Sequence, residues 1–228
     1  MSAIDEEMRP EREAMVREIE RIVTELGPQL GHTAFSPAVL DALGSVPRHA
    51  FVPPEQLSDA YRNRPLPIGF GQTISQPFIV ALMTDLAQLK PTDRVLDVGT
   101  GSGYQAAILA KLVSHVFTIE LCAPLAARAA QAFKRLGLHN ITTRVGDGHA
   151  GWPEEAPFDA IIVAAAPPEI PEALVSQLRP GGRLVIPVGG AAQQLIVVEK
   201  TRDQSTVRSE IIPVSFVPLM HEDDPGPA

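Results

Sequence analysis

The stretch that decides the fold is Arg94-Val95-Leu96-Asp97-Val98-Gly99-Thr100-Gly101-Ser102-Gly103-Tyr104. Val95, Leu96 and Val98 form the short apolar run expected of a strand that is covered on both faces. The three glycines let the backbone turn sharply and let a ligand approach main-chain N–H groups closely. The stretch therefore predicts a buried strand, a glycine-rich turn and the start of a helix, in that order.

Two acidic residues indicate the kind of ligand that this turn binds. The spacing Gly-x-Gly-x-Gly differs from the dinucleotide fingerprint G-x-G-x-x-G, and Asp97 stands just before the first glycine. A carboxylate there repels a pyrophosphate but suits a cationic or amino-bearing ligand. Glu120 ends the next apolar run, 21 residues after Gly99, where an acid can accept hydrogen bonds from both ribose hydroxyls. Together these features indicate a nucleoside without a pyrophosphate, and S-adenosylmethionine (AdoMet) fits best.

The composition excludes several classes of protein. A chain of 228 residues with 45% hydrophobic residues can bury one full core. The net charge of −8 argues against a nucleic-acid surface, and the single cysteine, Cys122, excludes an internal disulfide. The first twenty residues lack an apolar signal region, and no apolar run is long enough to span a bilayer. We expect a cytoplasmic monomer with no membrane or nucleic-acid partner.

From about residue 76 onward, the sequence alternates between strand and helix patterns. The expected strands are 94–98, 116–119, 141–145, 159–165, 183–188, 195–200 and 211–217. The expected helices are 5–26, 36–43, 76–89, 104–112, one opened by Pro124 and ended by Gly137, and 169–178. Gly27-Pro28 is expected to break the first helix, Ser36 to cap the second, and Pro180-Gly181-Gly182 to stop the last.

This alternation predicts an α/β fold with a doubly wound, mostly parallel sheet. The last two strands have no helical pattern between them, so they predict an antiparallel hairpin at one edge. Residues 44–75 are rich in Pro and Gly but also carry aromatic residues, which favours a packed, functional loop. We divide the chain into an N-terminal helical segment with a substrate and cofactor loop (1–75), an α/β core (76–220) and a flexible tail (221–228).

In such a sheet, ligands bind beyond the carboxyl ends of the strands. Segments 97–103, 120–121, 146–149 and 164–168 are expected there. Asp147 can accept a hydrogen bond from the exocyclic amine of an adenine. The alternative is a turn aspartate, since Asp-Gly is a common turn signal. Asp97, Glu120 and the glycines are expected at the same edge of the sheet, which favours the interpretation of Asp147 as an adenine-binding residue.

Other reactive side chains carry a weaker signal. Cys122 has no base beside it in the sequence and is interpreted as a bystander thiol. The six histidines show no metal-ligand spacing, so no metal is expected. His139 and His149 are expected to be solvent-facing turn residues.

The segment Pro65 to Pro77 places the hydroxyls of Thr73 and Ser75 at the entrance of a predicted helix. Ser75 can act as the N-cap of that helix. A helix N-terminus is also a ready site for a carboxylate. Both roles can hold at once.

Six segments, in order along residues 36–220, resemble the protein-L-isoaspartate O-methyltransferase family. They are VPRHAFVP (46–53), PLPIGFGQTISQP (65–77), VLDVGTGSGYQAA (95–107), GDGHAGWPEEAPFDAIIVAAAPPEIP (146–171), GGRLVIPVG (181–189) and FVPL (216–219). The glycine motif alone is typical of class I methyltransferases in general. GQTISQP is far more specific, because it is the family's own active-site motif.

This resemblance implies a Rossmann-like class I methyltransferase that uses AdoMet. The reaction it implies is methylation of the free α-carboxylate of L-isoaspartyl residues in peptides and proteins, as a repair step. It assigns the family's active-site serine to Ser75 and substrate contacts to Thr73, Ser75, Val217 and Pro218. It assigns cofactor contacts to Gln72, Thr73, Ile74, Asp97, Gly99, Gly101, Ser102, Glu120, Leu121, Asp147 and Gly148.

The sequence departs from the family pattern in two places. Ala164 stands where the family often has threonine, and residues 1–35 match weakly.

Two alternative functions stay open. The first alternative is a class I methyltransferase for a small molecule or a protein glutamine. The second is a non-catalytic module that binds damaged peptides, against which the presence of the whole cofactor motif argues.

Overall fold

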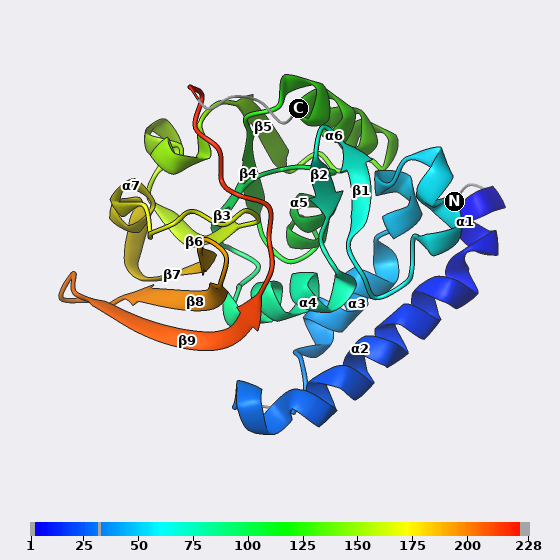
Figure 1. Ribbon diagram of the computed structural model, residues 1–228, viewed down its shortest axis with the longest axis horizontal. Coiled ribbons are helices and arrows are strands. Elements are labelled where there is room, and N and C mark those ends of the chain that lie inside the picture. Colours follow the sequence, from blue (N-terminus) through cyan, green and yellow to red (C-terminus); the bar gives the residue numbers. More distant parts are fainter. Residues whose placement is uncertain (1–2, 32, 224–228) are drawn as a thin grey trace.

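The computed structural model describes residues 3–31 and 33–223. Its centre is a seven-stranded sheet in the order β5-β4-β3-β6-β7-β8-β9 (Figure 1). The strands are β3 (Arg94–Val98), β4 (His115–Glu120), β5 (Ile141–Val145), β6 (Phe158–Val163), β7 (Leu178–Gly189), β8 (Gln193–Lys200) and β9 (Thr206–Val214). The first five strands in this order, from β5 through β4, β3 and β6 to β7, are parallel to one another. Strands β8 and β9 pair antiparallel with their neighbours. The predicted mostly parallel sheet with an antiparallel edge is confirmed.

The strand order reverses at β3, which pairs with β4 on one side and β6 on the other. Leu96 and Val98 pack into one hydrophobic cluster and Val95 into another, as the alternation of a strand dictates. The strand is therefore apolar on both faces. The connections that leave its carboxyl end diverge, which opens a crevice there.

Helices cover both faces of this sheet. They are α1 (Ala3–Glu7), α2 (Arg9–Leu30), α3 (Pro37–Ser45), α4 (Pro77–Leu86), α5 (Tyr104–Leu109), α6 (Ala123–Arg135) and α7 (Glu172–Ser176). Helices α2 to α6 pack into the larger hydrophobic cluster, and α7 belongs to the smaller one. The Ser36 hydroxyl accepts a bond from the Val39 N–H, so the predicted N-cap of α3 is confirmed. Among the described residues, none of the helices combines the length and apolar character needed to cross a membrane.

The predicted break at Gly27-Pro28 is wrong, because α2 continues to Leu30 (Figure 1). Gly27 extends the buried stripe of the helix, and its carbonyl accepts the N–H of Gly31. Gly31 ends the helix with φ 75°. Pro28 is exposed in the last turn, where a missing N–H removes only one intrahelical bond.

The last part of the sheet also differs from expectation. Helix α7 ends at Ser176, and β7 runs through Pro180-Gly181-Gly182, which we expected to be a stop. The pairing of β6 with β7 shifts register between Phe158 and Ala160, as in a β-bulge. A Cβ on Gly182 would lie 2.9 Å from two backbone oxygens, so the close approach requires glycine.

Strand β9 ends at Val214, earlier than the expected 217, and the chain then leaves the sheet. Residues 215–222, here called the C-terminal strap, cross the carboxyl end of the sheet (Figure 1). Pro218 forms an isolated parallel bridge with Ala166. Residues 224–228, which include most of the predicted tail, lie outside the described residues.

The segment 44–75 is more regular than expected. It holds the 3₁₀ helices η1 (Arg48–Phe51) and η2 (Pro54–Asp59), and two more, η3 (Gly148–Ala150) and η4 (Pro153–Glu155), follow later in the chain. Strands β1 (Leu66–Gly69) and β2 (Gln72–Ile74) form an antiparallel hairpin that the sequence analysis did not predict. The turn places Phe70 at φ 55° between two glycines that also have positive φ. This hairpin delivers Thr73 and Ser75 to the carboxyl edge of the sheet.

Candidate active site

Two neighbouring hollows lie at the carboxyl edge of the sheet. The larger, about 500 Å³, is walled by the loop after β3, the end of β4, the loop after β5, the β2 end of the hairpin and the strap. The smaller, about 460 Å³, lies among the hairpin, the start of α4 and residues 213–217. Thr73, Ser75, Ala164 and Val217 line both hollows. A molecule in one hollow can therefore meet a molecule in the other at these residues.

The glycine loop and Glu120 form one unit. Gly99 has φ 86° and donates its N–H to the carbonyl of Ile119. The Glu120 carboxylate accepts the N–H of Gly101 at 2.7 Å and the N–H of Cys122 at 2.9 Å, one on each oxygen. Each oxygen keeps a lone pair, so the pair of oxygens can also accept two ligand hydroxyls.

Asp97 lies behind this loop rather than on the wall of the cavity. It is fully buried, and one carboxylate oxygen accepts the hydroxyl of Thr118 at 2.8 Å. Its other oxygen has no hydrogen-bond partner within the described part of the chain. Burial raises the pKa of Asp97 to about 7, although the Thr118 hydrogen bond opposes the shift. The structure therefore does not bring Asp97 to the cavity surface, where a ligand contact was expected.

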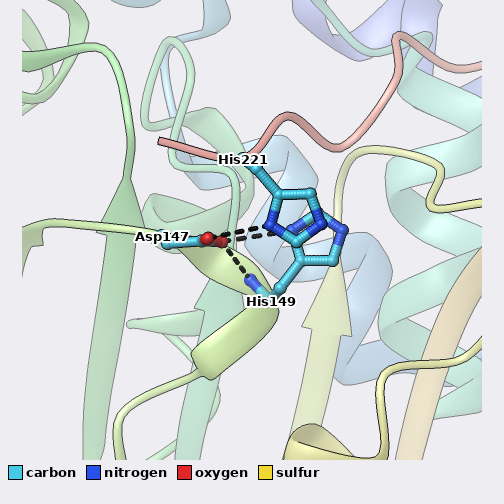
Figure 2. A group of neighbouring side chains, drawn as sticks. All are labelled: Asp147, His149 and His221. Atoms are coloured by element: carbon cyan, nitrogen blue, oxygen red, sulfur yellow. Dashed lines mark hydrogen bonds and ion pairs between the residues drawn. The ribbon is translucent and has the colours of Figure 1, made fainter. Parts of the chain in front are cut away.

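Asp147 sits at the start of η3, where Oδ1 accepts the N–H of His149 at 2.7 Å. The Nδ1 atoms of His149 and His221 lie 3.1 and 3.0 Å from its two carboxylate oxygens (Figure 2). Burial raises the pKa of Asp147, but these hydrogen bonds together lower it below its usual value. The carboxylate is thus occupied by histidine, and the adjoining Gly148 is the residue that lines the cavity.

The expectation that His149 faces solvent is wrong. Its side chain is only 15% exposed, and its ring stacks on that of His221 with 3.6 Å between centroids. His139 is exposed, as predicted. His221 was assigned to a flexible tail by the sequence analysis, whereas here it contacts Asp147 and lines the larger hollow.

Ser75 is not a helix cap. Helix α4 begins at Pro77, and its N-cap residue is Gln76, which makes no side-chain cap bond. The first-turn N–H of Phe78 is instead satisfied by the side-chain oxygen of Asn63 at 3.0 Å. Of the two roles open to Ser75, the cap is therefore wrong, and Ser75 instead lines both hollows.

The other predicted site residues line the larger hollow: Gln72, Thr73, Ile74, Gly99, Gly101, Ser102, Leu121, Gly148, Val217 and Pro218. The sequence analysis missed Phe70, Tyr104 and the end of the strap, and it interpreted Cys122 as a bystander although Cys122 also lines the cavity. The Gly-Phe-Gly turn was the only local signal that could have pointed to Phe70. The strap residues beyond FVPL (216–219) carry no motif, and their position depends on contacts with distant segments.

The fold and this site define a class of protein. A cavity of about 500 Å³ lies within the range of small-molecule sites. It is placed at the switch point of a doubly wound sheet, beside a glycine loop and a ribose-type acid. These residues fit AdoMet, and the structure is that of a Rossmann-like, AdoMet-dependent methyltransferase.

Comparison with known proteins gives the family. The chain belongs to the protein-L-isoaspartate(D-aspartate) O-methyltransferase family, whose model matches residues 22–224. It is 51% identical over 222 residues to protein-L-isoaspartate O-methyltransferase 1 of Cupriavidus necator, covering 96% of this chain and 86% of that protein. It is 55% identical over 207 residues to protein-L-isoaspartate O-methyltransferase 2 of a Polaromonas species, covering 90% and 98%.

A solved beta-aspartate methyltransferase from Plasmodium falciparum, in complex with S-adenosyl-L-homocysteine, has a TM-score of 0.72 to this chain. The two are 27% identical, with 88% of this chain and 98% of that one covered. The resemblance inferred from the sequence is confirmed. The family model begins at residue 22, so it leaves out most of residues 1–35, which the sequence analysis described as weakly matching.

Proposed function

We propose that this chain transfers the methyl group of AdoMet to the free α-carboxylate of L-isoaspartyl residues in damaged peptides and proteins. The observation that carries this proposal is the meeting of two hollows at Ser75 and Thr73. The larger is built for the cofactor and the smaller for a peptide. The reacting carboxylate and the methyl donor thus approach each other from opposite sides of these hydroxyls.

In this proposal the cofactor occupies the larger hollow. Its ribose hydroxyls bind Glu120, its adenine lies against Gly148, next to the histidine-bound Asp147, and its amino-acid end lies at the loop of Gly99, Gly101 and Ser102. Gln72, Thr73, Ile74 and Leu121 complete the wall. Asp97 supports the loop from behind, since its carboxylate does not reach the surface. When bound, AdoMet supplies an activated methyl group.

The substrate carboxylate needs no general base. An α-carboxyl group has a reference pKa of about 3.5, so it is ionised at neutral pH. Ser75 donates a hydrogen bond that orients this carboxylate, while Thr73, Val217 and Pro218 shape the wall beside it. Orientation and exclusion of water can lower a barrier by roughly 7–11 kcal/mol. The chain therefore contributes alignment rather than acid–base chemistry.

A paired-peptide assay with labelled AdoMet tests this function. The isoaspartyl peptide is expected to take up label, and the same peptide with a normal aspartyl residue is not. Equal labelling of both peptides would favour a methyltransferase of another specificity. Binding of S-adenosyl-L-homocysteine without any methylation would favour a non-catalytic module.

The proposal includes a monomer that works in the cytoplasm on polypeptides and not on nucleic acids. The net charge of −8 supports the exclusion of nucleic acid. Light scattering of the purified protein tests the oligomeric state.

A further inference from the structure

Three side chains from two distant parts of the chain converge beside the larger hollow (Figure 2). Asp147 and His149 belong to the loop and short helix after β5, whereas His221 comes from the strap, 74 positions later. Both imidazoles direct Nδ1 toward the same carboxylate, and the two rings are stacked at an interplanar angle of 13°. Proposed methyl transfer gives neither histidine a role.

The donor atoms of this cluster are those that transition metals prefer. Two imidazole nitrogens and one carboxylate oxygen suit Zn²⁺ and its neighbours, whereas Ca²⁺ and Mg²⁺ need a shell of oxygens. Three protein ligands also leave a coordination position for water, as in open zinc sites. The chemistry of the set therefore points to a borderline-soft divalent ion.

The distances are close to those that one ion requires. All three ligand atoms lie within 4.8 Å of one another. Ligands of a single zinc ion stand about 2.0–2.2 Å from it, so two of them in a tetrahedral site are about 3.4 Å apart. The farthest pair must therefore approach by up to about 1.4 Å, and one of the two stacked rings must tilt so that both nitrogens face the same point. The His221 side chain is 57% exposed, so it can rotate by this amount without disturbing the core.

We propose that Asp147, His149 and His221 bind one divalent transition-metal ion of the Zn²⁺ type. The ion takes the place of the two N–H hydrogen bonds to the carboxylate, and any proton carried by the coordinating nitrogens is released to solvent. Because its ligands come from the β5 loop and the strap, the bound metal ties these two segments together. The competing explanation is that the cluster only pins the strap by hydrogen bonds.

Calorimetric titration of the full chain with Zn²⁺ tests the proposal. We expect saturable binding of one equivalent per chain. His221→Ala and His149→Gln should each weaken the affinity at least tenfold. His139→Ala is the matched control, because His139 is exposed and lies outside the cluster, and it should leave the affinity unchanged.

Circular dichroism of each variant establishes that it is folded. Because the His221 side chain is exposed, its substitution should disturb folding less than that of His149. Absence of saturable binding by the unsubstituted chain would overturn the proposal. The cluster would then only hold the strap in place by hydrogen bonds. An affinity that survives in either histidine variant would overturn it as well. The readout is metal binding and not methylation, so failure of the proposed enzyme function would leave this result intact.

Discussion

At the scale of single residues, Ser75 is distinguished by the fact that it does not cap helix α4. Asn63 accepts a hydrogen bond from the first turn of α4, and Ser75 lines both hollows. In the proposed function, stability and catalysis at this corner of the molecule therefore rest on different side chains. Substitutions at the two positions should separate them.

Ser75→Ala is expected to lower kcat/KM for an isoaspartyl peptide by up to 10²–10³-fold, because one oriented hydrogen bond is worth about 2.7–4 kcal/mol at the upper end. Its melting temperature should stay near that of the unsubstituted protein. Asn63→Ala removes the acceptor of the Phe78 N–H and should lower the free energy of unfolding by about 0.5–2 kcal/mol. Steady-state kinetics and thermal melts on both variants check this. Unchanged kcat/KM in Ser75→Ala would refute the catalytic assignment.

Asp97 links pH to stability. Burial raises the pKa of Asp97 to about 7, whereas its unfolded value is near 3.8. Between these values the folded state holds a proton that the unfolded state has released, so stability falls as pH rises toward 7. The unfolding free energy should drop between about pH 4 and pH 7, and Asp97→Asn should reduce that drop by about 1–3 kcal/mol.

Urea unfolding at several pH values measures this effect. Asp41→Asn, on the exposed side of α3, is the matched control and should keep the pH dependence of the unsubstituted protein. The same pH profile in Asp97→Asn and the unsubstituted chain would show that Asp97 does not hold the proton.

At the scale of elements, the strap depends on one glutamine of β8. The Gln193 amide donates to the Phe216 carbonyl at 3.0 Å and accepts the Phe216 N–H at 2.6 Å. Backbone bonds from Ala166 to Val217 and from Leu219 to Ala166 hold the next residues. The wall that the strap gives to both hollows is thus fixed by a few contacts outside the sheet.

Gln193→Leu is expected to raise KM for an isoaspartyl peptide by roughly 5- to 150-fold, because two hydrogen bonds of about 0.5–1.5 kcal/mol each are lost. Hydrogen exchange in residues 215–222 should become faster. Gln194→Leu, one position along the same strand, is the control and should change neither quantity. If KM and exchange respond equally to both substitutions, the strap is not held by Gln193.

At the scale of the whole molecule, the cofactor hollow joins segments from the hairpin, β3, β4, β5 and the strap. A ligand that binds all of them stabilises only the folded chain. Product binding should therefore be visible as global stability.

S-adenosyl-L-homocysteine at about 100 times its Kd should add about 2.7 kcal/mol, which corresponds to a rise in Tm of about 5–11 °C for a chain of this size. Thermal melts with and without ligand measure the shift. NAD at the same concentration should leave Tm unchanged, because the loop lacks the dinucleotide spacing. An equal shift with NAD would contradict the assignment of the cavity.

Local chemistry was sufficient to predict much of this protein. The apolar run of β3, the glycine turn and the acid at the end of β4 are short-range patterns, and the alternation of helix and strand follows from side-chain periodicity. The order of motifs sufficed to predict the family. Each of these properties depends on residues that are neighbours in the chain.

Tertiary structure alone decided where distant residues meet. Pro28 stays helical and Gly182 stays in a strand, because packing and sheet pairing outweigh local breaking signals. The cap of α4 comes from Asn63, fifteen positions before Phe78, and His221 reaches Asp147 across 74 positions. Such contacts depend on the path of the whole chain, which no local pattern encodes. For that reason the cofactor motif and the FVPL segment could be predicted from the sequence, whereas the path of the strap across the sheet and the histidine cluster could not.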